Sequence, residues 1–290
     1  MAGDAHTTRW LVLYGAHLFP PRLAAILGDA KPVSSSTVTV RDAFLAFDVP
    51  GVPFLEPVYA NALLKGLNDA GEWQSTTEKD GGRDGEAYKR WVWERVCPGM
   101  TFEGSLPPNL EGMAYELPEA DFEAVLKAAR AASPNLPSSL YPVCAVKFAN
   151  GDPSKPLGEI SAELLALEPS VRPAGLQPSP QYLGLVLRGA FLNALSRPYV
   201  AYLTLIRPYV VSTPEKKRVR TLFRLLLLPS FILFYLPSRI LGIPQWRQLG
   251  SFLLGGGVTK LRLLEGYVRK WTGSGYVNEN DHKALQAMKL

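Results

Sequence analysis

The first side chains that could do chemistry stand in LVLYGAHLF, residues 11–19, where an apolar run ends on Tyr14-Gly15 and the chain turns at once. The apolar run predicts an early β-strand, and Gly15 permits the backbone angles that a tight turn needs. Ala16 adds no polar atom to this turn, whereas the imidazole of His17 can donate, accept or titrate near neutral pH. The structural alternative is a buried tyrosine over a turn, followed by a surface histidine.

Three further side chains stand where they could serve a site. Glu56 lies in FLEPVYA, Tyr182 follows the PSP of PSPQY, and Arg188 precedes a Gly-Ala pair on a predicted helix. A guanidinium is suited to anchoring a carboxylate, and Tyr182 would order a loop next to a pocket. For each residue a structural role stays open: solvation at a strand edge for Glu56, loop packing for Tyr182 and a surface ion pair for Arg188.

Several classes of chemistry lack support in the sequence. The chain has no phosphate loop, dinucleotide fingerprint or Gly-x-Ser-x-Gly elbow, which argues against nucleotide enzymes and α/β-hydrolases. Its histidines show no ligand spacing, so we predict neither a metal nor another cofactor. Cys97 and Cys144 are far apart and form no CxxC pair. This favours reduced thiols in a reducing compartment over a single disulfide.

The composition is that of a globular protein with a local excess of positive charge. Of 290 residues, 47% are apolar and 20% are charged, which excludes wholesale disorder. The formal net charge is +5, and residues 215–224, EKKRVRTLFR, hold five cations against one acid. Such a run is either a solvated face or a membrane-binding segment. Because leucines rather than stacking residues interleave the cations, attraction to a membrane surface is favoured and nucleic acid is not an expected partner.

Strands predominate early in the chain and helices late, which predicts the α+β class. A polar, glycine-rich insertion separates the early strands at 71–90. The predicted helices are 119–132, 161–168 and a pair within 178–209 that breaks near 196–198. The predicted strands are 10–14, 33–40, 43–49, 51–64, 110–117 and 139–150.

Four motifs together resemble the γ-glutamylcyclotransferase-like fold family. They are YGxxL at 14–18, GVPFLEPVYANAL at 51–63, EGMAYEL at 111–117 and PSPQYLGLVLRGAFLNAL at 178–195. The chain is most similar to fungal specialised-metabolism members of the gliotoxin-biosynthesis type, which add a basic and apolar C-terminal segment. The resemblance covers about residues 10–210 and implies an α+β fold with a small mixed β-barrel packed by helices.

The resemblance also implies a substrate site. In the family, the loop after the first strand, usually Tyr-Gly-Ser-Asn, offers backbone amides that hold the substrate carboxylate. Here Ala16 and His17 stand at the serine and asparagine positions. The catalytic candidates are Tyr14, His17 and Tyr182. The substrate-binding candidates are Gly15, Ala16, Leu18, Glu56 and Arg188.

The family's catalytic glutamate has no counterpart at the matching position. That residue lies near the end of the helix after the EGMAYEL strand, which corresponds to VLKAARAAS at 125–133 and places it on Ala128 or Ala129. No glutamate occurs between Glu123 and Glu159. Because a positioned general acid or base contributes about 10²–10⁴ in rate, we expect a poor cyclotransferase or none.

We therefore predict a repurposed enzyme of fungal specialised metabolism that cyclises a lipophilic small molecule without a cofactor, by lyase or isomerase chemistry that includes pericyclic closure. Holding a flexible substrate in a reactive conformation can itself supply several kcal/mol, and Tyr14, His17 or Tyr182 would polarise a carbonyl. Two alternatives stay open. One is release of 5-oxoproline from γ-glutamyl compounds, and the other is a non-catalytic protein that binds a small molecule.

The C-terminal part is expected to be a separate extension, 211–275, after a domain at 8–210. Its uncharged run 225–238 contains two prolines and is shorter than the roughly 20 residues that span a bilayer. Flanking cations and aromatics suit a segment in the membrane interface, joined by a basic amphipathic helix at 257–271. The alternatives are a buried helix or a hydrophobic flap over the pocket.

The expected surroundings follow from these features. We expect a cytoplasmic protein that lies peripherally on an intracellular membrane, since no secretory signal is recognisable. Its partners would be a lipophilic substrate and the membrane surface. The oligomeric state stays open, with a homodimer among the choices.

Overall fold

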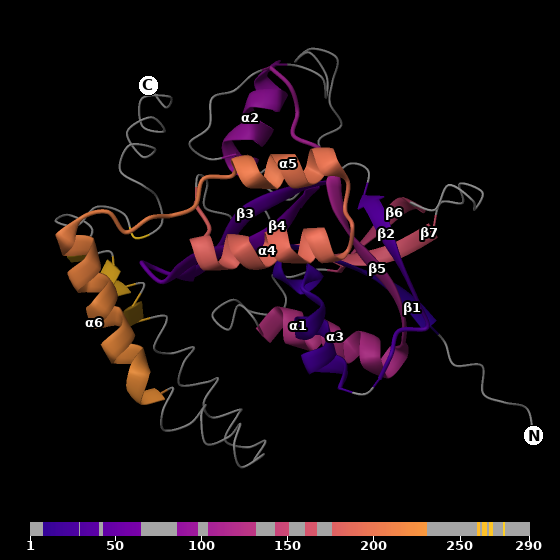
Figure 1. Cartoon of the computed structure of the whole chain (residues 1–290), viewed down its shortest axis with the longest axis horizontal. Coiled ribbons are helices and arrows are strands. Elements are labelled where there is room, and N and C mark those ends of the chain that lie inside the picture. Colours follow the sequence, from indigo (N-terminus) through magenta and orange to yellow (C-terminus); the bar gives the residue numbers. More distant parts are fainter. Residues whose placement is uncertain are drawn as a thin grey trace, which may run out of the picture.

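The structure is a computed structural model, shown in Figure 1. It describes residues 8–28, 30–40, 43–64, 86–97, 104–131, 143–150, 160–166 and 176–230, together with 260, 261, 263–265, 267, 268 and 275. The strands are β1 (Thr8–Leu13), β2 (Ser34–Val40), β3 (Ala43–Val52), β4 (Glu56–Leu64), β5 (Leu110–Pro118), β6 (Val143–Asn150) and β7 (Ile160–Leu165). The helices are the 3₁₀ turn η1 (Gly15–Leu18), α1 (Pro20–Leu27), α2 (Glu86–Val96), α3 (Glu119–Ala131), α4 (Pro180–Leu192), α5 (Arg197–Leu205) and α6 (Pro214–Ser230).

The strands form two separate groups. Five of them follow the order β1-β5-β2-β6-β7, and a short parallel pairing of Leu11 and Val12 with Glu163 and Leu164 links β7 to β1. The other pairings are antiparallel. β3 and β4 pair only with each other. The α+β class is thus confirmed. The prediction of one small barrel-like sheet is confirmed only in part, because the β3–β4 hairpin forms a separate sheet.

The helix predicted at 161–168 is wrong, because residues 160–165 form strand β7. The segment has helical spacing of apolar residues, but it lies between β6 and β1 in the sheet. The Nη2 of Arg9 donates to the two carboxylate oxygens of Glu163 at 2.5 and 2.6 Å. Arg9 also bonds Glu119 of α3 at 2.7 Å. Tertiary pairing here overrides local helix propensity.

The helices that cover the sheets follow the sequence pattern more closely. α3 buries Phe122, Val125 and Leu126 on one face, as its spacing predicts. α2 begins at Glu86, inside the segment that we expected to be an insertion loop up to residue 90. The residues before it, 65–85, lie outside the described part of the chain.

The two helices predicted within 178–209 are confirmed as α4 and α5. Each begins with a serine N-cap and a nearby proline, Ser179 before α4 and Ser196 before α5. The serine hydroxyls accept from the amides of Tyr182 and Tyr199 at 3.0 and 3.3 Å. An N-cap of this kind satisfies an amide that the helix leaves unpaired.

A second hydrophobic cluster lies at the tip of the β3–β4 hairpin. Phe54, Tyr209, Phe223 and Leu261 form its buried part, and the rings of Phe54 and Phe223 meet edge to face at 5.4 Å. Figure 1 shows α6 and the yellow turns at 260–268 at the hairpin end of the molecule. The beginning of the predicted extension thus packs against the hairpin.

The predicted apolar run 225–238 falls inside the described residues only up to Ser230, where it continues α6. Of the helix predicted at 257–271, residues 260, 261, 263–265, 267 and 268 are described, and they are helical. Among the helices that the structure describes, none has the length and apolar character needed to cross a membrane.

Candidate functional site

The Tyr-Gly turn is built around a close approach to strand β4. Gly15 has φ of +60°, and a Cβ placed on it would lie 2.6 Å from the Cβ of Ala60 and 3.4 Å from the hydroxyl of Tyr182. The left-handed backbone and the contact with Ala60 both require glycine. The turn η1 therefore brings β1, β4 and α4 together at one point.

A β-bulge in β3 lies opposite β4 at the same place. Between the pairs Ala46–Asn61 and Val49–Tyr59, residues Phe47 and Asp48 face the single residue Ala60. Bulges of this type redirect side chains and occur often beside active sites. The side chain of Asp48 is 1% exposed, so the bulge places a carboxyl group within the protein interior.

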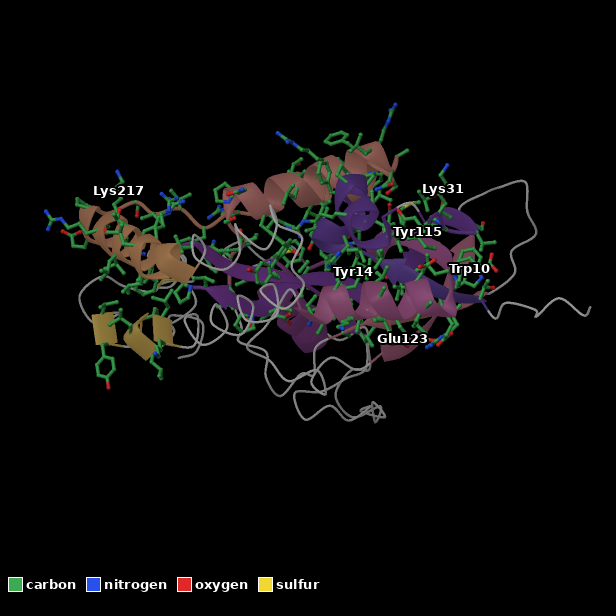
Figure 2. All side chains as sticks on the ribbon, turned by 90° about the horizontal axis from the view of Figure 1, so that it is seen from below. Trp10, Tyr14, Lys31, Tyr115, Glu123 and Lys217 are labelled. Carbon is green, nitrogen blue, oxygen red and sulfur yellow. The ribbon has the colours of Figure 1, made fainter. Side chains whose placement is uncertain are left out.

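Two tyrosines bind the backbone along β4. The amide of Ala60 donates to the Tyr182 hydroxyl at 3.0 Å, and the amide of Ala62 donates to the Tyr14 hydroxyl at 3.1 Å. The Tyr14 hydroxyl in turn donates to the carbonyl of Leu165 at the end of β7. Figure 2 shows Tyr14 in the middle of the molecule. Tyr14, a predicted catalytic residue, thus joins β1, β4 and β7 through hydrogen bonds to backbone groups.

Glu56 is the carboxyl group that the site holds most specifically. Its Oε2 accepts from the Ser179 hydroxyl at 2.6 Å, and its Oε1 accepts from the Ser179 amide at 3.2 Å. Burial raises the pKa of Glu56 to about 7, while the two Ser179 bonds and the charge of Arg22 oppose that rise. A carboxyl group that titrates near neutral pH can both take up and release a proton there.

Tyr182 is linked to this acid through Ser179, whose hydroxyl accepts from the Tyr182 amide and donates to Glu56. Burial raises its pKa to about 12, and the negative charge of Glu56 adds to the rise, whereas the amides of Ala60 and Ala16 and the charge of Arg22 lower it. The hydroxyl therefore keeps its proton at neutral pH. Among the described residues no acceptor takes that proton, so the hydroxyl can donate it to a ligand atom.

The surroundings of Tyr182 are aromatic. Its ring meets the ring of Tyr59 at 5.3 Å and the ring of Phe47 at 6.4 Å, both nearly edge to face. Tyr59 and Glu56 are half-buried, so the acid and the aromatic edge are within reach of a small molecule. Aromatic contacts of this geometry favour flat or apolar ligands.

His17 differs from the sequence expectation. Burial lowers its pKa to about 4, and the charge of Arg22 lowers it further. The imidazole is therefore neutral at pH 7 and does not titrate near neutrality as we predicted. Its Nδ1 is shielded from solvent and has no hydrogen-bond partner among the described residues.

The remaining predicted residues are placed differently. Ala16 and Leu18 are buried in η1, and a Cβ on Gly189 of α4 would lie 2.6 Å from the Cβ of Leu18. Leu18 thus packs the turn on α4, and the backbone amide of Ala16 bonds the hydroxyl of Tyr182. Arg188 lies on the exposed side of α4, away from that contact. The structure brings together Tyr14, Gly15, Ala16, Glu56 and Tyr182, but not Arg188.

Three residues of the site were missed in the sequence. Ser179 binds Glu56, the charge of Arg22 acts on His17, Glu56 and Tyr182, and Asp48 lies in the bulge. Ser179 is the N-cap residue of the PSPQY motif and could have been identified from that pattern. A single acid in the apolar run at 43–49 was the available signal for Asp48. Nothing local marks Arg22, which lies on the exposed side of α1.

The position that would carry the family glutamate lies elsewhere. Ala128 is half-buried on α3, and the side chain of Ala129 is outside the described part of the structure. The acid that the structure holds near the candidate site is Glu56 of β4, which binds Ser179 at the start of α4. Among the described residues, no group of three or more His, Cys, Asp or Glu could hold a metal ion.

Comparison with known proteins gives similarity in shape only. No family model matches the chain, and no curated protein matches it. A solved gamma-glutamyl cyclotransferase is 15% identical with a TM-score of 0.46, and the match covers 74% of this chain and 99% of that one. An uncharacterized human protein is 15% identical with a TM-score of 0.45, and the match covers 74% of this chain and 98% of that one.

A yeast gamma-glutamyl cyclotransferase specific to glutathione is 12% identical with a TM-score of 0.39, and the match covers 69% of this chain and 96% of that one. At these TM-scores the similarity bears on neither activity nor substrate. The geometry around Glu56 is therefore the basis for a functional assignment.

Proposed function

We propose that this chain is an enzyme that closes a ring in a lipophilic small molecule by acid–base catalysis at Glu56. The observation that supports the proposal best is a carboxyl group with a pKa of about 7 that is bound to Ser179 and whose charge acts on the protonated hydroxyl of Tyr182. The aromatic edge formed by Tyr59 and Phe47 favours an apolar substrate. The fungal specialised-metabolism setting rests on the sequence resemblance and stays part of this proposal.

The chemistry follows from the two side chains. Ionised Glu56 takes a proton from the attacking group of the substrate as the new bond forms. Tyr182 donates a hydrogen bond to the oxygen on which negative charge develops, which stabilises the transition state. Neutral Glu56 then returns the proton to that oxygen or to the leaving group. The positive charge of Arg22 favours the ionised form of Glu56 that the first step needs.

The same carboxyl group favours a second candidate function. Release of 5-oxoproline from γ-glutamyl compounds needs an acid–base residue, and the sequence offered none at the family position. Glu56 can fill that role from β4. The two functions differ in substrate class, since a γ-glutamyl compound is polar and zwitterionic whereas the proposed substrate is apolar.

The test uses two probes with the full chain. The first is a linear γ-amino ester with an aromatic substituent, which closes to a lactam and releases an alcohol. The second is a panel of γ-glutamyl dipeptides, assayed for 5-oxoproline. We expect the wild type to accelerate lactam formation and Glu56→Gln to reduce that rate about 10²–10⁴-fold. We expect 5-oxoproline at background level.

A matched control separates catalysis from folding. Glu111 accepts from the amide and the hydroxyl of Ser196 just as Glu56 does from Ser179, but the Ser196 side chain is exposed. Glu111→Gln should keep the wild-type rate. Formation of 5-oxoproline would select the second candidate. Binding of the aromatic ester in calorimetry with no rate increase would overturn both in favour of a binding protein.

A further inference from the structure

Helix α6 has one face that is covered and one that is not. Its inner stripe contains the buried residues Lys216 and Phe223, and Val219 and Leu227 pack partly against the cluster around Phe54. The spacing of these four positions is that of a single helix face. The tip of the β3–β4 hairpin therefore accounts for the inner side of α6.

The outer face combines cations with exposed leucines. Leu222, Leu225 and Leu226 are 45%, 58% and 53% exposed. Lys217 and Arg218 lie one to two turns before them and are exposed as well. Figure 2 shows Lys217 directed away from the body of the molecule, at the end opposite Trp10. The charges are concentrated in the first half of α6 and the leucines in the second half.

We propose that α6 docks through this outer face on a membrane surface that contains anionic lipid. Exposed leucines on one side of a helix are unfavourable in water and gain when they enter the boundary between headgroups and acyl chains. The adjacent cations match the negative potential of anionic headgroups, and each contributes about fivefold in affinity. This pairing of charge with apolar surface identifies a bilayer as the occupant.

The docking would also place the candidate site close to the bilayer. The ring of Phe223 on the inner stripe contacts the ring of Phe54, which is two residues from Glu56 in the chain. The proposal itself does not depend on any reaction at Glu56, because it rests on the outer face of α6.

The experiment is co-sedimentation of the full chain with vesicles of phosphatidylcholine alone or with phosphatidylserine added. We expect binding to the anionic vesicles that falls as salt rises. Replacing Leu222, Leu225 and Leu226 with serine should reduce binding at least tenfold. Replacing Lys217, Arg218 and Arg224 with glutamine should abolish the preference for phosphatidylserine.

The matched control uses an exposed apolar pair from another helix. Phe191 and Leu192 on α4 are 67% and 63% exposed, and their replacement with serine should leave vesicle binding unchanged. Circular dichroism checks that each variant is folded. Equal sedimentation of the wild type and the leucine variant would overturn the proposal. So would self-association in light scattering that requires the same three leucines, since the face would then bind a second copy of the chain.

Discussion

The replacement of Glu56 with glutamine tests the electrostatics of the site through protein stability. Glutamine has the shape of a neutral glutamic acid and does not titrate. In the wild type the pKa of Glu56 is about 7, against 4.5 for an exposed glutamate. Folding therefore favours the neutral form, and the stability that this form contributes is fully present below pH 4.5. It is lost as the pH rises through 7.

The size of the effect follows from the same pKa values. Each unit of difference between the folded and unfolded pKa corresponds to about 1.4 kcal/mol of folding free energy. The rise of the Glu56 pKa from 4.5 to about 7 therefore limits the pH-dependent change in stability to about 3.4 kcal/mol. Because Glu56 is half-buried and solvent screens part of its charge, we expect about 2 kcal/mol. The wild type should lose this amount relative to Glu56→Gln between pH 4 and pH 8.5.

The assay is urea unfolding of both proteins at several pH values, followed by tryptophan fluorescence. Other titrating groups cancel because only the difference between the two proteins is used. Glu111→Gln provides the reference for a serine-capping carboxylate whose serine is exposed. A difference between the wild type and Glu56→Gln that does not change with pH, or that changes in the opposite direction, would refute the reasoning.

Three further predictions concern the turn, the tyrosine and the hairpin. Gly15→Ala should destabilise the protein by about 3 kcal/mol in thermal unfolding, since the new methyl group meets Ala60 at 2.6 Å. Gly28→Ala is the control, because it adds only backbone strain, and Ala60→Gly should rescue Gly15→Ala in part. Tyr182→Phe leaves the Ala60 amide without its acceptor and should cost about 1–3 kcal/mol in urea unfolding; no loss would contradict this role. Phe54 has a buried side chain, so Phe54→Ala should cost about 3–5 kcal/mol in urea unfolding. Because its φ is +63°, Phe54→Gly should cost about 1 kcal/mol less than Phe54→Ala, although glycine usually destabilises more than alanine.

The elements that depend on local chemistry could be predicted. Serine and proline before α4 and α5 specify both helix starts, and the alternating residues of β2 and β5 mark strands. The segment 160–165 could not be assigned, because its helical spacing is overruled by pairing with β6 and β1 and by the ion pair between Arg9 and Glu163. That pairing joins residues that are far apart in the chain.

The candidate site could be located but not interpreted. The Tyr-Gly turn and Tyr182 were predicted to lie together, and they do. The state of the ionisable groups could not be read from the sequence, because burial decides it: His17 becomes neutral and Glu56 becomes an acid of nearly neutral pKa. The sequence also assigned Glu56 to substrate binding, since its contact with Ser179 joins β4 to a residue more than a hundred positions away.

The most direct test of the account is the titration of the Glu56 carboxyl group by carbon NMR in the full chain, with Glu56→Gln used to assign the signal. The account predicts a midpoint at about pH 7, and a downward shift when a substrate with a cationic group binds. A midpoint near 4.5 would contradict it, because Glu56 would then be an ordinary helix-capping carboxylate without a role in proton transfer.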